Sequence, residues 1–214
     1  MTDINKFIAF QEIMGRLKHL KRTGWIMQNI QNSETVASHS WRMAVMALQK
    51  EKDLKKLGVN INHVIQMCLL HDVSEAIVGD IVPEHHQTTK KKITKQKKHM
   101  LEIEAVKKMA TQYNFEKIKT LFVEYEDQKT LESIIVKNLD KLDMLLQAYE
   151  YSQKYPQFTR LNEFMEYNEQ DITIPLFQKY LEEIKVRQNN NFNKKQATFC
   201  NTKHTIKSEG NKKI

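Results

Sequence analysis

The chain has few of the residues that build turn-rich or disulfide-stabilised proteins. Its 214 residues include five glycines, three prolines and two cysteines, Cys68 and Cys200. Two cysteines cannot form a disulfide framework or a cysteine-based zinc module, and so few glycines and prolines disfavour a β protein. No apolar run approaches the roughly 20 residues of a membrane span, and the N-terminus has no apolar signal segment. We therefore expect a soluble cytoplasmic protein with no membrane partner.

The positive charge is concentrated at the C-terminal end. The net charge is +8, and the segment from Arg187 to the C-terminus, with seven Lys/Arg and one Glu, accounts for +6 of it. Apolar residues in this segment follow no period, so residues 189–214 are predicted to be a disordered tail. Residues 1–188 are long enough to bury one core and are predicted to be a single domain. The lysine run over 90–98 lacks interleaved aromatic residues, so no nucleic-acid partner is expected.

Apolar residues recur at helical spacing through the body, and no segment shows sustained period-two alternation. Helices are predicted over residues 4–20, 35–49, 61–78, 89–113, 115–126, 130–154, 160–167 and 175–186. Gly24 is predicted to act as a breaker after the first helix, Asn32 or Ser33 to lie near the N-cap of the second, and Asn60 to cap the third. The pattern predicts an all-α helical bundle.

The third predicted helix carries polar residues in apolar surroundings. His71, Asp72 and Glu75 lie at positions i, i+1 and i+4, so on a helix they face roughly the same way. Unpaired imidazole and carboxylate groups in a core are costly, and a metal ion removes that cost. A lone His-Asp pair also occurs by chance, and a histidine near a helix end is more often a cap or a satisfied core residue. The pair alone therefore leaves both interpretations open.

Two further apolar segments hold residues of the same kind, His39 and Asp140. Histidine or aspartate residues thus occur in three predicted core helices, and three independent coincidences are a poor explanation of that pattern. Two imidazoles and two carboxylates suit borderline to hard ions and leave coordination positions for water or a phosphate oxygen. We predict a metal-dependent phosphohydrolase with one divalent ion, which is cobalt, manganese, zinc, iron or magnesium.

Three segments carry a family resemblance: SETVASHSWRMA at 33–44, LHDVSEAIVGDI at 70–81 and LDKLDM at 139–144. In this order they resemble the HD-domain superfamily of metal-dependent phosphohydrolases. More narrowly, they resemble its 5′-deoxynucleotidase branch, which removes phosphate from deoxyribonucleoside 5′-monophosphates. The resemblance runs from about residue 16 to residue 151 and leaves the tail outside. It implies an HD-type bundle, a nucleotide substrate and a homodimer.

Carried over residue by residue, the resemblance implies four ligands of one divalent ion: His39, His71, Asp72 and Asp140. Asp143 lies one helical turn after Asp140 and is the alternative carboxylate. Asp140 is preferred because LDK matches the family motif.

The resemblance also implies residues around the substrate. Glu75 and Asp80 would stand at the reacting phosphate, Glu75 to orient or deprotonate a water and Asp80 to handle a proton or hold the sugar edge. Arg22 would be a cation on the phosphate side, and Trp25 would lie against the sugar. The residue before the first metal histidine is usually acidic in this branch and is Ser38 here, which could change the support of that histidine.

Two alternative functions stay open. Other HD hydrolases act on nucleoside triphosphates, guanosine alarmones or cyclic nucleotides, but the Trp25 segment and the short single domain favour a monophosphate. A different class is a non-catalytic protein with a structural metal, whose basic tail and lysine helix bind nucleic acid. Nucleic-acid affinity that survives deletion of residues 189–214, without turnover, would support that class.

Overall fold

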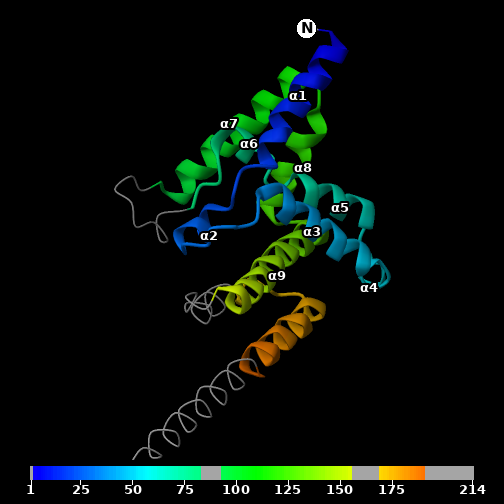
Figure 1. Ribbon diagram of the computed structural model, residues 1–214. Helices are drawn as coiled ribbons and strands as arrows, with labels where there is room; N and C mark the ends of the chain where they lie inside the picture. Colours follow the sequence, from blue (N-terminus) through cyan, green and yellow to red (C-terminus); the bar gives the residue numbers. More distant parts are fainter. Residues whose placement is uncertain (1, 83–92, 156–168, 191–214) are drawn as a thin grey trace, which may run out of the picture.

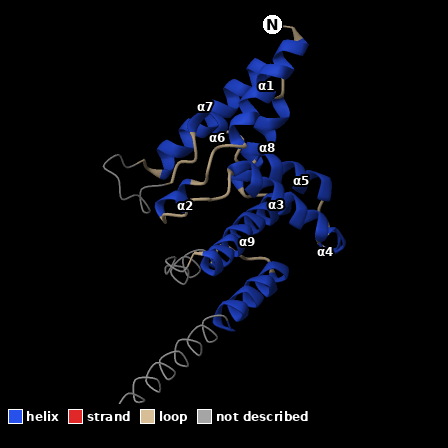
Figure 2. Cartoon of the chain, viewed as in Figure 1, coloured by secondary structure: helices blue, strands red, loops and turns tan. Residues whose placement is uncertain are grey.

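The chain folds into helices, as shown by a computed structural model that describes residues 2–82, 93–155 and 169–190 (Figures 1 and 2). The named helices are α1 (Asp3–Leu17), α2 (Thr23–Met27), α3 (Val36–Gln49), α4 (Glu51–Lys56), α5 (Ile61–Leu70), α6 (Glu75–Val78), α7 (Lys95–Tyr113), α8 (Glu116–Asp127) and α9 (Leu131–Lys154). A further helix covers 175–190. The described ranges hold no β-strand beyond one isolated bridge, between Lys21 and Thr35. The predicted all-α fold is confirmed.

The largest apolar core forms where α3, α5 and α9 pack on one another (Figure 1). Periodic apolar residues supply it, because every third or fourth residue of a helix returns to the same face. Its fully buried members include Met43, Ala47, Val64, Met67, Leu139 and Leu145. These three helices, or the residue that follows one of them, carry His39, His71 and Asp140, so the predicted ligands lie at the centre of the molecule.

A second apolar cluster joins α1, α7 and α8. Phe10, Val106 and Phe122 are buried in it, together with Val73 from the turn that follows α5. Leu70, the last residue of α5, packs against both clusters. The segment around His71 therefore lies at the junction of the two cores.

The segment predicted as one helix over 61–78 is broken, so that prediction is wrong in its middle. α5 ends at Leu70, and a turn follows in which the N–H of Val73 donates to Leu70 O and the N–H of Glu75 donates to Asp72 O, both at 3.1 Å. α6 then begins at Glu75 and ends before Gly79, whose φ of 79° suits glycine. Asp72 and Ser74 favour such turns, because their side chains compete with helical backbone bonds. Glu75 therefore does not lie one regular helical turn beyond His71.

Helix starts agree only in part with the sequence. Asn60 caps α5, its side chain accepting from the N–H of His63 at 3.3 Å, as predicted. α3 is capped by Thr35 rather than by Asn32 or Ser33. Gly24 does not break a helix but lies inside the short α2, while α1 has already ended at Leu17.

The remaining helix predictions match closely where they can be compared. The helices predicted over 115–126 and 130–154 correspond to α8 and α9, and the helix predicted over 175–186 extends to 190. It thus passes the predicted domain boundary at 188. Residues 89–92, the helix predicted over 160–167 and the tail from 191 lie outside the described residues. Within those described, no helix is both long enough and apolar enough to cross a membrane.

Asn138 on α9 fastens the C-terminal part of the described chain to the core. It is 1% exposed, and its Oδ1 accepts from the backbone N–H groups of Thr173 and Ile174 at 2.8 and 2.9 Å. We expect Asn138→Ala to lower the free energy of unfolding by about 1–3 kcal/mol, because two N–H groups lose their acceptor. Urea unfolding measures this, with the exposed Asn62→Ala as control. A change equal to that of the control would contradict the prediction.

Candidate metal centre

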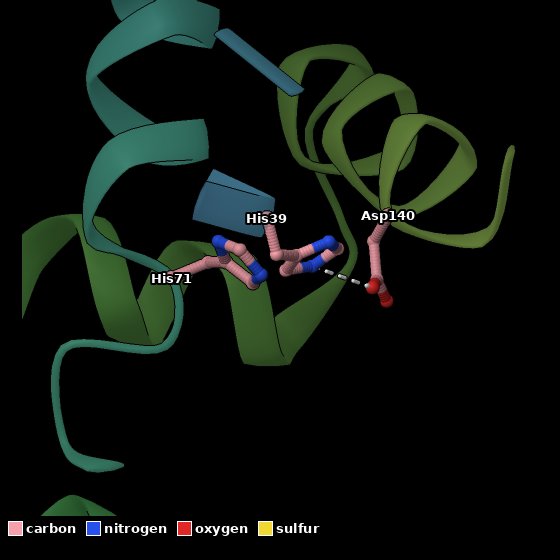
Figure 3. Close-up of side chains that lie close together, drawn as sticks. All are labelled: His39, His71 and Asp140. Atoms are coloured by element: carbon pink, nitrogen blue, oxygen red, sulfur yellow. Dashed lines mark ion pairs between the residues drawn. The ribbon is translucent and has the colours of Figure 1, made fainter. Parts of the chain in front are cut away.

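Three predicted ligands meet at the core: His39 from α3, His71 from the turn after α5 and Asp140 from α9 (Figure 3). One nitrogen from each ring and one carboxylate oxygen all lie within 4.8 Å of one another, and all three residues are buried. Nε2 of His39 lies 3.3 Å from Oδ1 of Asp140. Two donors that each lie 2.0–2.2 Å from one ion can be at most about 4.4 Å apart, and the 3.3 Å between His39 and Asp140 meets that limit.

The other nitrogen of each ring is engaged in a hydrogen bond. Nδ1 of His39 lies 2.7 Å from Oδ2 of Asp143, and Nδ1 of His71 lies 2.9 Å from the carbonyl oxygen of Cys68. Both partners are acceptors, so each Nδ1 carries a hydrogen and each Nε2 can offer its lone pair to an ion. Metal-binding histidines are usually oriented by such a bond.

The donors fit a divalent ion. Among the described residues, neither Nε2 atom has a hydrogen-bond partner, although both are buried. Burial and Arg22 lower the pKa of His39, but the carboxylates of Asp140 and Asp143 outweigh them and raise it to about 9. The carboxylates that favour a positive charge on the ring would also favour a bound cation. Two imidazoles and a carboxylate are a donor set that zinc, cobalt, manganese and iron accept.

Asp72 lies beside this group rather than within it. Its Oδ2 is 3.1 Å from Nε2 of His71 and accepts from Nη1 of Arg22 at 3.2 Å. Burial alone raises the pKa of Asp72, but His71 and Arg22 overcome that effect and hold it below its usual range. Asp72 is therefore an ionised carboxylate next to one of the clustered imidazoles.

The start of α2 is held against the site by carboxylates. Besides the Arg22 contact, the N–H of Thr23 donates to Oδ2 of Asp80 at 2.6 Å and its hydroxyl donates to the Asp80 carbonyl at 2.7 Å. Burial lowers the pKa of Arg22, but Asp72, Asp80 and Asp140 raise it above its ordinary value. The predicted cation thus stands among the predicted acidic residues.

Trp25, on the short helix α2, is buried. Its indole is 2% exposed, Nε1 donates to Oε1 of Glu34 at 2.8 Å, and its ring meets the edge of Tyr151 at 5.3 Å between centroids. A side chain so buried has little area for a sugar to contact. In this structure Trp25 orients Glu34 from a buried position, so the predicted sugar contact would require the indole to become exposed.

Glu75 is a buried carboxyl group. It is 3% exposed, and within the described part of the chain its Oε2 has no hydrogen-bond partner. Burial raises the pKa of Glu75 well above its usual value, and the charges of Asp72 and Asp80 add to the effect. A carboxylate whose pKa is raised is a stronger base than an ordinary one, which suits general acid or base catalysis.

A family model for the HD domain matches residues 14–179. The chain belongs to the HD domain family. Its HD-domain relatives include 5′-deoxynucleotidase HDDC2 of Dictyostelium discoideum, which is 39% identical over 71% of this chain and 80% of that protein. The protein of the same name from Homo sapiens is 38% identical, over 73% of this chain and 74% of its own length.

Solved structures share the HD-domain fold. A conserved hypothetical protein from Pyrococcus furiosus is 30% identical, has a TM-score of 0.66 and is matched over 83% of this chain and 98% of its own. The HD domain-containing protein YGK1 is 24% identical, has a TM-score of 0.58 and is matched over 88% of both chains. The second likeness concerns the fold alone.

The HD-domain site includes residues that the sequence did not single out. The Tyr125 hydroxyl donates to Oδ2 of Asp140 at 3.2 Å, and its ring meets the edge of the His71 ring at 5.1 Å between centroids. Nζ of Lys137 lies 3.4 Å from the same Asp140 oxygen. Lys137, one turn before Asp140, could have been found from helical spacing, whereas nothing in the local sequence marks Tyr125.

Ser38 does not support the first histidine. It lies at the start of α3, where its hydroxyl and that of Thr35 accept from each other's backbone N–H in a capping box. The support of His39 comes from α9 through Asp143, which is fully buried. The departure at this position therefore affects the helix start, and Asp143 is an orienting residue in this structure.

Lys98 on α7 is a second cation near the acidic residues. Burial lowers its pKa, but Glu102, Asp72, Glu75 and Asp80 raise it above its usual value. Its Nζ lies 3.4 Å from Oε1 of Glu102. The sequence placed Lys98 only at the end of a lysine run, and the structure brings it within electrostatic reach of the site.

Glu102 makes stability depend on pH. It is 7% exposed, and burial raises its pKa from 4.5 to about 7, against the opposing effect of Lys98. A carboxyl group whose pKa is raised by folding destabilises the protein as pH rises from 4.5 to 7. We expect Glu102→Gln to be more stable than the wild type by about 3 kcal/mol at pH 8, and equal to it below pH 4.5. Urea unfolding across this pH range measures the difference, and a constant difference would contradict the prediction.

Proposed function

We propose that the chain is a metal-dependent 5′-deoxynucleotidase, which hydrolyses deoxyribonucleoside 5′-monophosphates to a deoxynucleoside and phosphate. The observation that carries the proposal is the pair of buried Nε2 atoms of His39 and His71, which make no hydrogen bond within the described part of the chain and lie 3.3 and 3.1 Å from the carboxylates of Asp140 and Asp72. The names of the relatives at 38–39% identity support the substrate class.

The proposed ligands of one divalent ion are His39, His71, Asp72 and Asp140. The donor set suits cobalt, manganese, zinc or iron, and magnesium is the harder alternative. When bound, such an ion stabilises negative charge on a phosphoryl group and lowers the pKa of water. Asp72 would contribute by turning its carboxylate from Arg22 towards the ion, a change that also frees the guanidinium.

Arg22 would then bind the substrate phosphate. A guanidinium offers two parallel N–H donors that match phosphate oxygens, and at 16% side-chain exposure it is within reach of solvent. Lys98 lies near the same carboxylates and adds positive charge. The cations thereby offset repulsion between an anionic substrate and the acidic residues.

Glu75 is the proposed proton acceptor. In its ionised form the carboxylate, buried next to Asp72, would take the proton from the attacking water and hold it during bond cleavage, and the burial that raises its pKa makes it the stronger base. Asp80 would relay to the departing 5′ oxygen the proton that Glu75 takes from water, or hold the sugar edge. Its Oδ2 accepts from Thr23, which fixes its carboxylate at the start of α2.

Trp25 is proposed to lie against the sugar of the bound substrate. Its buried ring holds Glu34 and abuts Tyr151. A direct contact with the sugar would follow if binding opened the segment and exposed the indole. We further propose a cytoplasmic homodimer, with residues 1–188 as the domain and 189–214 as a separate tail.

The first experiment measures phosphate release from matched deoxyribo- and ribonucleoside 5′-monophosphates, with cobalt, manganese, zinc and magnesium in turn. The proposal expects metal-dependent release that favours the deoxy substrates. Release only from triphosphates, guanosine alarmones or cyclic nucleotides would identify another HD hydrolase. No release from any of them, with nucleic-acid binding that survives removal of residues 189–214, would identify the non-catalytic class.

A further inference from the structure

Arg42 on α3 binds three successive turns of α9. Its Nε donates to Oδ1 of Asp143, its Nη2 donates to Oε1 of Gln147 at 2.9 Å, and its Nη1 donates to both carboxylate oxygens of Glu150 at 2.9 and 3.0 Å. These acceptors occupy positions i, i+4 and i+7 of α9, so they form one stripe along the helix. We call these four residues the Arg42 clamp.

Asp143 is the member of the clamp that reaches the metal centre. Its side chain is fully buried, with Oδ1 accepting from Arg42 and Oδ2 accepting from Nδ1 of His39 at 2.7 Å. A buried carboxylate is costly unless its oxygens accept hydrogen bonds, and both oxygens of Asp143 do so. The orientation of the His39 ring therefore depends on a carboxylate that Arg42 holds from the other side.

The clamp connects the two helices that carry a histidine ligand and a carboxylate ligand. On α3, Arg42 lies one turn after His39, and on α9, Asp143 lies one turn after Asp140. The contact between Arg42 and Asp143 thus repeats, one turn away, the 3.3 Å approach of His39 to Asp140. Any change in the spacing of the helices at one contact is transmitted to the other.

We propose that Arg42 is a positioning residue of the metal centre, which acts through Asp143 to orient His39 and to set its distance from Asp140. The inference rests on the proposed metal site. It gives a role to Arg42, which is neither a proposed ligand nor a proposed substrate-binding residue. Lysine cannot replace the arginine fully, because only a guanidinium has a planar fork of five donors that serves three acceptors at once.

The test compares cobalt affinity in variants of full-length protein stripped of metal. Cobalt is titrated by its visible absorption, which also reports the ligand geometry. We expect Arg42→Met and Asp143→Asn each to weaken cobalt binding about 10–100-fold, the range typical of lost ligand-orienting residues. Arg42→Lys should restore only part of the loss. The matched control is Arg187→Met, since Arg187 also donates from Nε to a carboxylate, that of Glu183, but is exposed; it should stay within twofold.

A double-variant cycle tests whether Arg42 acts through Asp143. If it does, the variant with both Arg42→Met and Asp143→Asn loses little more affinity than the weaker-binding single variant, because the same interaction is removed twice. If the double variant loses cobalt affinity by the product of the two single losses, Arg42 does not act through Asp143. Folded single variants that bind cobalt within twofold of wild type would overturn the proposal altogether.

A measurement on the wild type guards against variants that do not fold. In zinc-loaded protein labelled with 15N at histidine, NMR should show a protected hydrogen on Nδ1 of His39 and metal ligation through Nε2. Ligation through Nδ1, or rapid exchange of that hydrogen, would overturn the proposal. A wild type that binds neither cobalt nor zinc would overturn the metal site and the clamp together, whereas normal binding in every variant overturns the clamp alone.

Discussion

Glu75→Gln is expected to lower the rate of metal-dependent phosphate release by about 10²–10⁴-fold, the usual contribution of a general acid or base. Glutamine has nearly the same shape but cannot accept a proton from water. Because the surroundings of Glu75 already favour its neutral form, a neutral isostere costs little in folding. We therefore expect cobalt affinity within a few fold of wild type and a melting temperature that is equal or higher.

The rate is measured as phosphate released under saturating metal and substrate. Glu116→Gln on α8 is the matched control, since Glu116 is an exposed carboxylate in the first turn of its helix. It should leave the rate unchanged. Retention of more than a tenth of the wild-type rate in Glu75→Gln would remove Glu75 from the mechanism, and a parallel fall in cobalt affinity would make it part of the metal site instead.

His71→Ala and Asp140→Asn are expected to abolish metal binding and turnover together. Each removes a donor atom of the buried group, so the loss should exceed the roughly 10–100-fold expected of residues that only orient ligands. The comparison of Asp140→Asn with Asp143→Asn separates a ligand from its support. The larger loss should follow replacement of Asp140.

A thermal shift makes this loss visible without an activity assay. Metal at about 100 times its dissociation constant stabilises the folded state by about 2.7 kcal/mol if it binds only that state. The wild type should therefore melt higher with cobalt than with a chelator, whereas His71→Ala and Asp140→Asn should melt at the same temperature in both. A cobalt shift of wild-type size in Asp140→Asn, together with its absence in Asp143→Asn, would move the ligand assignment to Asp143.

Sequence patterns were sufficient for the helices whose apolar faces meet the core. α8, α9 and the start of α5 follow from periodicity and an asparagine cap, because these signals are local. The break after Leu70 did not follow, since Val73 leaves the helical path to pack with Phe10 and Val106. Contacts between distant segments decide that turn, and a local pattern does not contain them.

The residues of the candidate site also fall into those that the sequence predicted and those that it did not. His39, His71 and Asp140 were predicted from polar residues in apolar helices and do come together. Arg42 and Tyr125 were not predicted, because nothing near them in the chain indicates which helix they face. Their contacts with residues of α9 appear only after α3, α8 and α9 have packed.

Asn138 and Asp140 stand two positions apart on α9, which places them about 200° apart around the helix axis. One side of α9 therefore holds the segment at 173–174, while the other presents a carboxylate to the imidazoles. A rotation of α9 about its axis that moved Asn138 away from the segment at 173–174 would also move Asp140 away from the imidazoles. The C-terminal helix, none of whose described residues belongs to the buried donor group, thus constrains the angular setting of Asp140, and we expect damage to its docking to weaken metal binding.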